Sequence, residues 1–167
     1  MISVLVSLLI ISGGLFSGMR LQAVSLTGIY YAKSSTHATS LISDIAERMH
    51  INISETLAGS YDVASLTALP DDENPDYDPD CSQNVCNPTQ LAAYDLKNWQ
   101  SSFPHTLNNI SAAITPLSNN TGAREIIIRW DDDGNGSTGT NCPPIVLEAE
   151  NEADTDLDCV ALEVSFK

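Results

Sequence analysis

Asp131, Asp133 and Asn135 occupy alternate positions of one short segment, and Gly136 follows them. This spacing matches the first half of an EF-hand loop, in which alternate oxygen ligands and a glycine wrap around a calcium ion. The twelfth position of such a loop is Cys142 here, instead of the glutamate that completes a calcium site. An acidic turn after a strand explains the same residues without a metal. We therefore keep these three residues as weak calcium candidates and expect no cofactor otherwise.

The cysteines favour disulfides over a metal site. The chain has four of them, Cys81, Cys86, Cys142 and Cys159. Four cysteines allow three pairings, and the simplest joins Cys81 to Cys86 and Cys142 to Cys159. Zinc is the weaker alternative, because the paired C-x2-C spacing of zinc sites is missing. Disulfides persist in oxidising compartments, so we expect the part that carries the cysteines to face the periplasm or the exterior.

No group of residues in the sequence has the pattern of a catalytic site. His37, His50 and His105 are isolated, whereas catalysis needs several convergent groups. The chain carries 7 Lys and Arg against 22 Asp and Glu, a net charge of −15. Such a surface repels phosphate backbones, which argues against nucleic-acid binding. We expect a protein that is not an enzyme and does not bind nucleic acid.

The N-terminal part of the sequence predicts one long helix, apolar at first and amphipathic later. Residues 1–19 carry no charge, and a helix of this length measures about 30 Å, enough to cross a bilayer once. No proline interrupts the segment from Arg20 to Met49. The last part of this segment has apolar residues at helical spacing, which is typical of a helix that packs one face on a core. These residues are Ala38, Leu41, Ile42, Ile45, Ala46 and Met49. We predict a helix over residues 1–50 and a disulfide-bearing head over residues 51–167.

The head mixes loops, one further helix and strands. Pro70–Asp80 is rich in proline and acid and predicts a loop. Asn87 as a cap, with proline and glutamine after it, predicts a second helix over Pro88–Ser102. The predicted strands are Arg124–Trp130, Pro144–Ala149 and Val160–Phe166, the last with Val160, Leu162, Val164 and Phe166 facing the first helix. The expected fold class is α+β, a long N-terminal helix packed on a small antiparallel sheet.

This order of parts resembles the type IV pilins. The stretches Ile2–Val6, Ser12–Phe16 and Leu21–Gln22 are similar, in order, to the apolar start of pilin helices. Ser40–Met49 and Gln90–Trp99 resemble segments of the minor pilins called pilus modification proteins, the PilV type. The resemblance implies a pilin-like fold and a structural function.

The start of the chain departs from the family pattern. Aligned on Ile2, Met1 falls at the third mature position, and the leader that prepilin peptidase removes is missing, so we expect a truncated or internal start. Ser3 stands where the family has an acid that pairs with the amino terminus of a neighbouring subunit. The resemblance therefore marks Ile2, Ser3, Val4 and Leu5 as assembly residues, with that ion pair in doubt.

The resemblance implies a minor pilin anchored in the inner membrane by residues 1–19, with a periplasmic head, which then enters the extracellular pilus or its initiating tip complex. The implied partners are other minor pilins, the major pilin and a large tip adhesin. A minor pseudopilin of a type II secretion system is the nearest alternative. A membrane-anchored periplasmic module that binds calcium or another ligand is the alternative from a different class.

Overall fold

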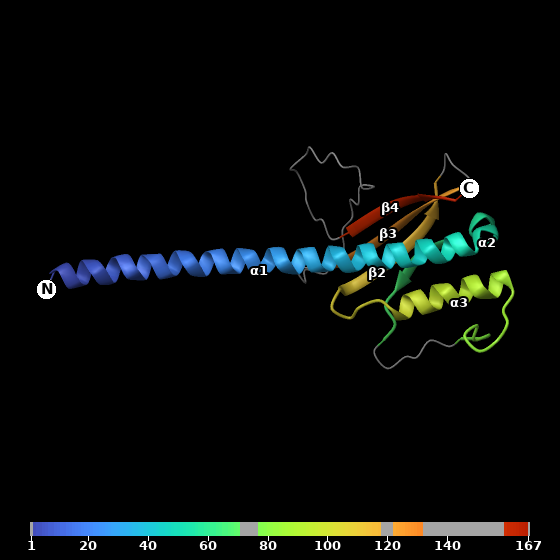
Figure 1. The fold of residues 1–167 in the computed structure, drawn as a ribbon, viewed down its shortest axis with the longest axis horizontal. Coiled ribbons are helices and arrows are strands. Elements are labelled where there is room, and N and C mark those ends of the chain that lie inside the picture. Colours follow the sequence, from blue (N-terminus) through green and yellow to red (C-terminus); the bar gives the residue numbers. More distant parts are fainter. Residues whose placement is uncertain (1, 71–76, 118–121, 132–158, 167) are drawn as a thin grey trace. The chain divides into compact units, whose positions relative to one another are not determined.

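The computed structural model describes residues 2–70, 77–117, 122–131 and 159–166 (Figure 1). Its fold is α+β, as the sequence predicts, and the sheet has four strands, all antiparallel. The chain divides into two compact units, Met1–Ser34 and Ser35–Lys167. The elements are α1 (Ile2–Ile51), α2 (Ile53–Ala58), β1 (Val63–Thr67), α3 (Pro88–Ser101), β2 (Asn108–Pro116), β3 (Ala123–Asp131) and β4 (Cys159–Ser165).

The first unit consists of the N-terminal part of α1. Helical structure runs from Ile2 to Ile51, and Met1 lies outside the described residues. Leu26, Ile29 and Tyr30 are exposed. Within the part of the chain that the structure describes, no helix is long and apolar enough to cross a membrane.

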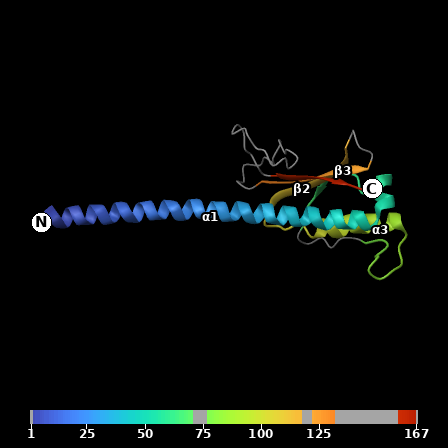
Figure 2. The same cartoon turned by 45° about the horizontal axis from the view of Figure 1, so that its top comes forward.

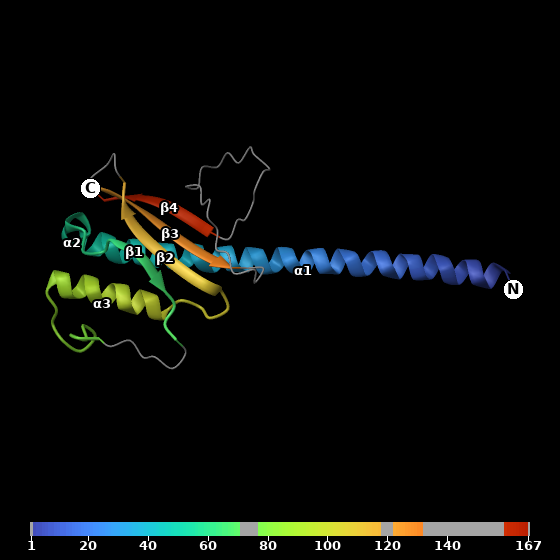
Figure 3. The ribbon, with the colours of Figure 1, turned by 180° about the vertical axis from the view of Figure 1, so that it is seen from behind.

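The second part of α1 belongs to the compact unit that contains the sheet, and it supplies much of the core. All six apolar residues of the predicted stripe are buried there: Ala38, Leu41, Ile42, Ile45, Ala46 and Met49. They share one hydrophobic cluster with side chains of β2 and β3, among them Ile114, Ile126 and Ile128. From Ser35 onward α1 crosses one face of the sheet (Figures 1 and 3), and the helix and the sheet form two layers (Figure 2).

The sheet has the order β1-β2-β3-β4, so each strand pairs with its neighbour in the chain. The predicted strands Arg124–Trp130 and Val160–Phe166 correspond to β3 and β4. Phe166, just after β4, is buried in the core, as predicted. Val160, Leu162 and Val164 pack against the same cluster. The third predicted strand, Pro144–Ala149, lies outside the described residues.

Two strands and a short helix come in addition to the predicted elements, which include no strand before Arg124. α2 and β1 lie between α1 and the predicted loop at Pro70–Asp80, and β2 pairs with β3 over most of its length. β2 is rich in Asn, Ser and Ala, residues with little intrinsic preference for strands. Its strand conformation therefore comes from its pairing with β1 on one side and β3 on the other, and from burial of Ile110 and Ile114.

Helix α3 begins as the sequence predicts. The side-chain oxygen of Asn87 accepts a hydrogen bond from the amide of Gln90 at 2.9 Å, and the Gln90 side chain accepts one from the Asn87 amide at 3.0 Å. This capping box satisfies two amides at the start of the helix. Ala92 and Trp99 are buried on one face of α3, and Phe103, just after the helix, is buried as well. Trp99 donates to the carbonyl of Leu41 at 2.8 Å, so α3 lies beside α1 (Figure 3).

Candidate functional site

The predicted functional residues at the start of the chain lie in the first turns of α1. Ile2, Ser3, Val4 and Leu5 are helical, but their side chains lie outside the described part of the structure. Their assembly role stays a prediction.

Of the three predicted calcium residues, the structure describes Asp131 alone. Asp131 is the last residue of β3 and is buried, with 3% of its surface exposed. This corrects the expectation that Asp131 begins a turn, because β3 continues one residue past Trp130 and pairs Asp131 with Asn108. Asp133 and Asn135 lie outside the described residues. Among the residues that are described, no three His, Cys, Asp or Glu side chains form a group that could hold a metal ion.

The first predicted disulfide is present, between Cys81 and Cys86. It closes a short loop directly before α3, with Cα atoms 5.6 Å apart. Cys159 at the start of β4 is also disulfide-bonded. Its predicted partner, Cys142, lies outside the described residues, so the pairing of these two stays a prediction.

A partly buried polar network that is not among the sequence predictions joins α1 to α3. Asp95 of α3 accepts a hydrogen bond from the Tyr61 hydroxyl at 2.7 Å and forms a salt bridge with Arg48 of α1 at 3.3 Å. Arg48 also contacts Asp44, one turn earlier, at 3.1 Å. Burial and the bond to Asp95 raise the pKa of Tyr61, so its hydroxyl stays protonated and donates. Burial alone lowers the pKa of Arg48, but the bonds and charges of Asp44 and Asp95 raise it overall.

Asn52 extends this network to the first turn of α3. Its side-chain nitrogen donates to the carbonyl of Pro88 at 2.7 Å and to the hydroxyl of Tyr61 at 3.4 Å. The network therefore fixes how α3 sits against the end of α1. A sequence signal for it exists: Asp95 falls between Ala92 and Trp99 on the apolar face of the helix, where an unpaired charge would be costly.

A second buried ion pair holds the turn after α2 against the sheet. Arg124 of β3, with 4% of its side chain exposed, contacts Asp62 at 2.6 Å and donates to the carbonyl of Thr56 at 2.8 Å. Gly59 ends α2 with φ of +89°, a conformation that suits glycine. A Cβ at this position would lie 3.0 Å from the Asp62 carboxylate. The turn thus presents Asp62 to the guanidinium of Arg124.

The histidines remain separate from one another. His37 and His105 are exposed, and His50 packs its ring against Phe166 with centroids 4.6 Å apart. The polar residues that the structure does bring together, Asp95 with Arg48 and Asp62 with Arg124, are held in ion pairs that tie elements together. The two ion pairs therefore position α3 against α1 and the turn after α2 against the sheet.

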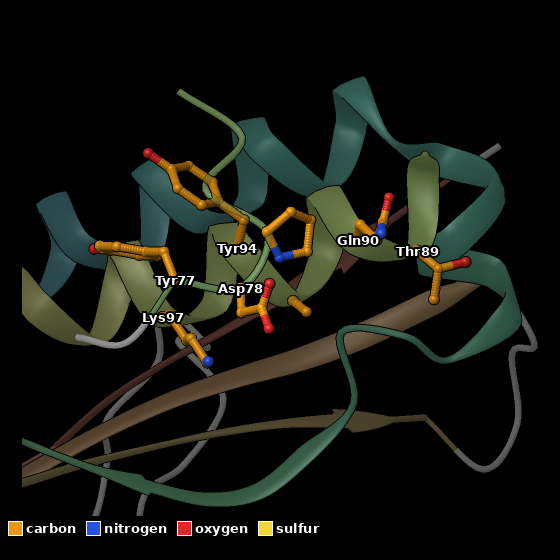
Figure 4. A pocket seen from close by; sticks show the side chains of 8 residues that line it. Tyr77, Asp78, Thr89, Gln90, Tyr94 and Lys97 are labelled. Carbon is orange, nitrogen blue, oxygen red and sulfur yellow. The ribbon is translucent and has the colours of Figure 1, made fainter. Parts of the chain in front are cut away.

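The surface of α3 carries a hollow of about 210 Å³ (Figure 4). It lies between the helix and the segment before the Cys81–Cys86 disulfide, and no pattern in the sequence predicts it. Eight residues line it: Tyr77, Asp78, Pro79, Thr89, Gln90, Ala93, Tyr94 and Lys97. A second hollow, of about 360 Å³, lies where β1 ends and β2 begins, beside His105.

Comparison with known proteins finds no matching family model, no matching curated protein and no matching solved structure.

Proposed function

We propose that this chain is a structural minor pilin, similar to the PilV type, that takes part in assembly of a type IV pilus or of its initiating tip complex. Residues 1–19 anchor it in the inner membrane, and the head is periplasmic until the subunit enters the filament. Its partners are the major pilin, other minor pilins and a large tip adhesin. The mechanism is burial of an apolar helix, first among lipids and then among the helices of other subunits.

One observation carries this proposal: the two segments that resemble the PilV type pack against each other. Ser40–Met49 supplies Leu41, whose carbonyl accepts the hydrogen bond from Trp99. It also supplies Arg48, which forms the salt bridge with Asp95. Trp99 and Asp95 both belong to the second segment, Gln90–Trp99. Two stretches that resemble one family therefore form a single helix–helix junction, which is what a shared fold requires.

The packing of α1 agrees with the same proposal. The stripe from Ala38 to Met49 is buried on the antiparallel sheet, whereas Leu26, Ile29 and Tyr30 earlier in the helix are exposed. Leu26, Ile29 and Tyr30 fall at helical spacing on one face, and apolar side chains gathered on an exposed face are typical of a surface that other molecules cover. A pilin helix has this division, with one part in its own head and the other among lipids or neighbouring subunits.

Deleting the gene in the native host is expected to reduce the number of surface pili and to leave export of type II secretion substrates unchanged. The reason is that an initiating or minor subunit acts on filament assembly alone. Electron microscopy counts the pili, and enzyme activity in the culture medium measures secretion. Restoring the gene on a plasmid is the control. Normal piliation with lost secretion would instead identify a minor pseudopilin.

A further inference from the structure

The hollow on α3 has a wall made by two tyrosines. The rings of Tyr77 and Tyr94 pack with centroids 4.9 Å apart, and both are half-buried. Figure 4 shows Tyr77 and Tyr94 together at one end of the hollow, with Thr89 and Gln90 at the other. Pro79 and Ala93 add further apolar surface. Aromatic and apolar lining with a few polar groups is typical of small-molecule sites.

The polar side chains that line the hollow can both donate and accept hydrogen bonds. Asp78 is exposed and lines the hollow, and its carboxylate accepts hydrogen bonds. The side-chain oxygen of Gln90 is used in the capping box, which leaves its NH₂ group as a donor. The Thr89 hydroxyl donates to Glu55 at 3.2 Å and can still accept. Lys97 adds a positive charge to the lining.

We propose that this hollow binds one ring of a neutral sugar. A pyranose presents a face of C–H groups, which packs on aromatic rings, and a rim of hydroxyls, which both donate and accept. The volume of about 210 Å³ lies below the range of about 300–1,000 Å³ typical of larger ligands, so it fits a single ring. The net charge of −15 and Asp78 disfavour anions, and the uncharged hydrogen-bonding side chains of Thr89 and Gln90 suit a neutral ligand.

The test is ligand-observed saturation-transfer NMR on the full-length chain with glucose, galactose or N-acetylglucosamine as the probe. The detergent must carry no sugar headgroup, since alkyl glycosides would occupy the site. We expect saturation of the ring C–H protons of at least one sugar and a dissociation constant in the millimolar range, because one ring offers few contacts. Tyr94→Ala and Asp78→Ala should each weaken binding about tenfold. The matched control is Tyr30→Ala, which removes an exposed tyrosine that does not line the hollow.

Circular dichroism of each variant shows whether the head still folds. If Tyr94→Ala does not fold, Asp78→Ala, at an exposed position, is the variant that decides the result. Absence of transfer to all three sugars would overturn the proposal. Transfer that both variants leave unchanged, or equal binding of acetate or choline, would also overturn it. The assay uses the isolated chain, so its outcome is independent of whether the chain is a pilin.

Discussion

Trp99→Ala is expected to lower the free energy of unfolding of the head by about 4 kcal/mol. Trp99 is completely buried, and its ring meets Phe103 edge-on with centroids 5.0 Å apart. Its indole nitrogen donates to the carbonyl of Leu41 in α1. Truncation would therefore leave a large cavity between α1 and α3 and remove the hydrogen bond that joins them. Urea unfolding followed by circular dichroism measures the change.

Trp99→Phe separates the two contributions. It keeps most of the ring and removes the donor, so its cost should be smaller than that of Trp99→Ala. Leu57→Ala is the control at an exposed apolar position of α2, with an expected change below about 1 kcal/mol. If Trp99→Ala costs no more than Leu57→Ala, α3 does not hold the end of α1 as described.

Arg124→Ala is expected to cost about 3 kcal/mol, the second largest effect. The substitution removes a buried guanidinium and leaves the Asp62 carboxylate and the carbonyl of Thr56 without their donor. Asp62 keeps 27% of its side chain exposed, so water solvates its carboxylate in part. The loss in the free energy of unfolding therefore stays near the lower end of the range for a broken buried ion pair. The same unfolding assay applies.

Arg129→Ala, on the same strand, is the matched control for Arg124→Ala. Arg129 is half-buried and five residues along β3, so its loss should change stability by less than about 1 kcal/mol. Combining Arg124→Ala with Asp62→Ala should cost less than the sum of the two single changes, because each already breaks the same pair. Additive costs would show that the ion pair contributes nothing to the turn.

The sequence predicts the parts of the fold that rest on a local pattern. The stripe that ends at Met49 has the helical period, and the start of α3 has a capping box, so both could be placed from spacing alone. β2 could not, because its small polar residues become a strand through pairing with β1 and β3. Strand pairing of this kind depends on residues distant in the sequence.

The polar contacts of the head were missed for the same reason. Asp95 lies 47 positions from Arg48, and Arg124 lies 62 positions from Asp62. Arg124 and Asp62 have no signature in the local sequence, and the one signal for the other pair is that Asp95 falls on the apolar face of α3. The hollow on α3 likewise needs the segment at Tyr77 folded back on the helix. Spacing along the chain cannot predict such a contact.

The most direct test of the proposed function is to ask whether this chain is part of a pilus. Pili sheared from the native host would be purified and digested, and peptides of the head would be sought by mass spectrometry. A strain without the major pilin is the control for membrane fragments. The account predicts peptides of this chain in the pilus fraction and their loss from that fraction in the control strain. Equal amounts in both fractions, or a chain found only in membranes of a well-piliated strain, would contradict it.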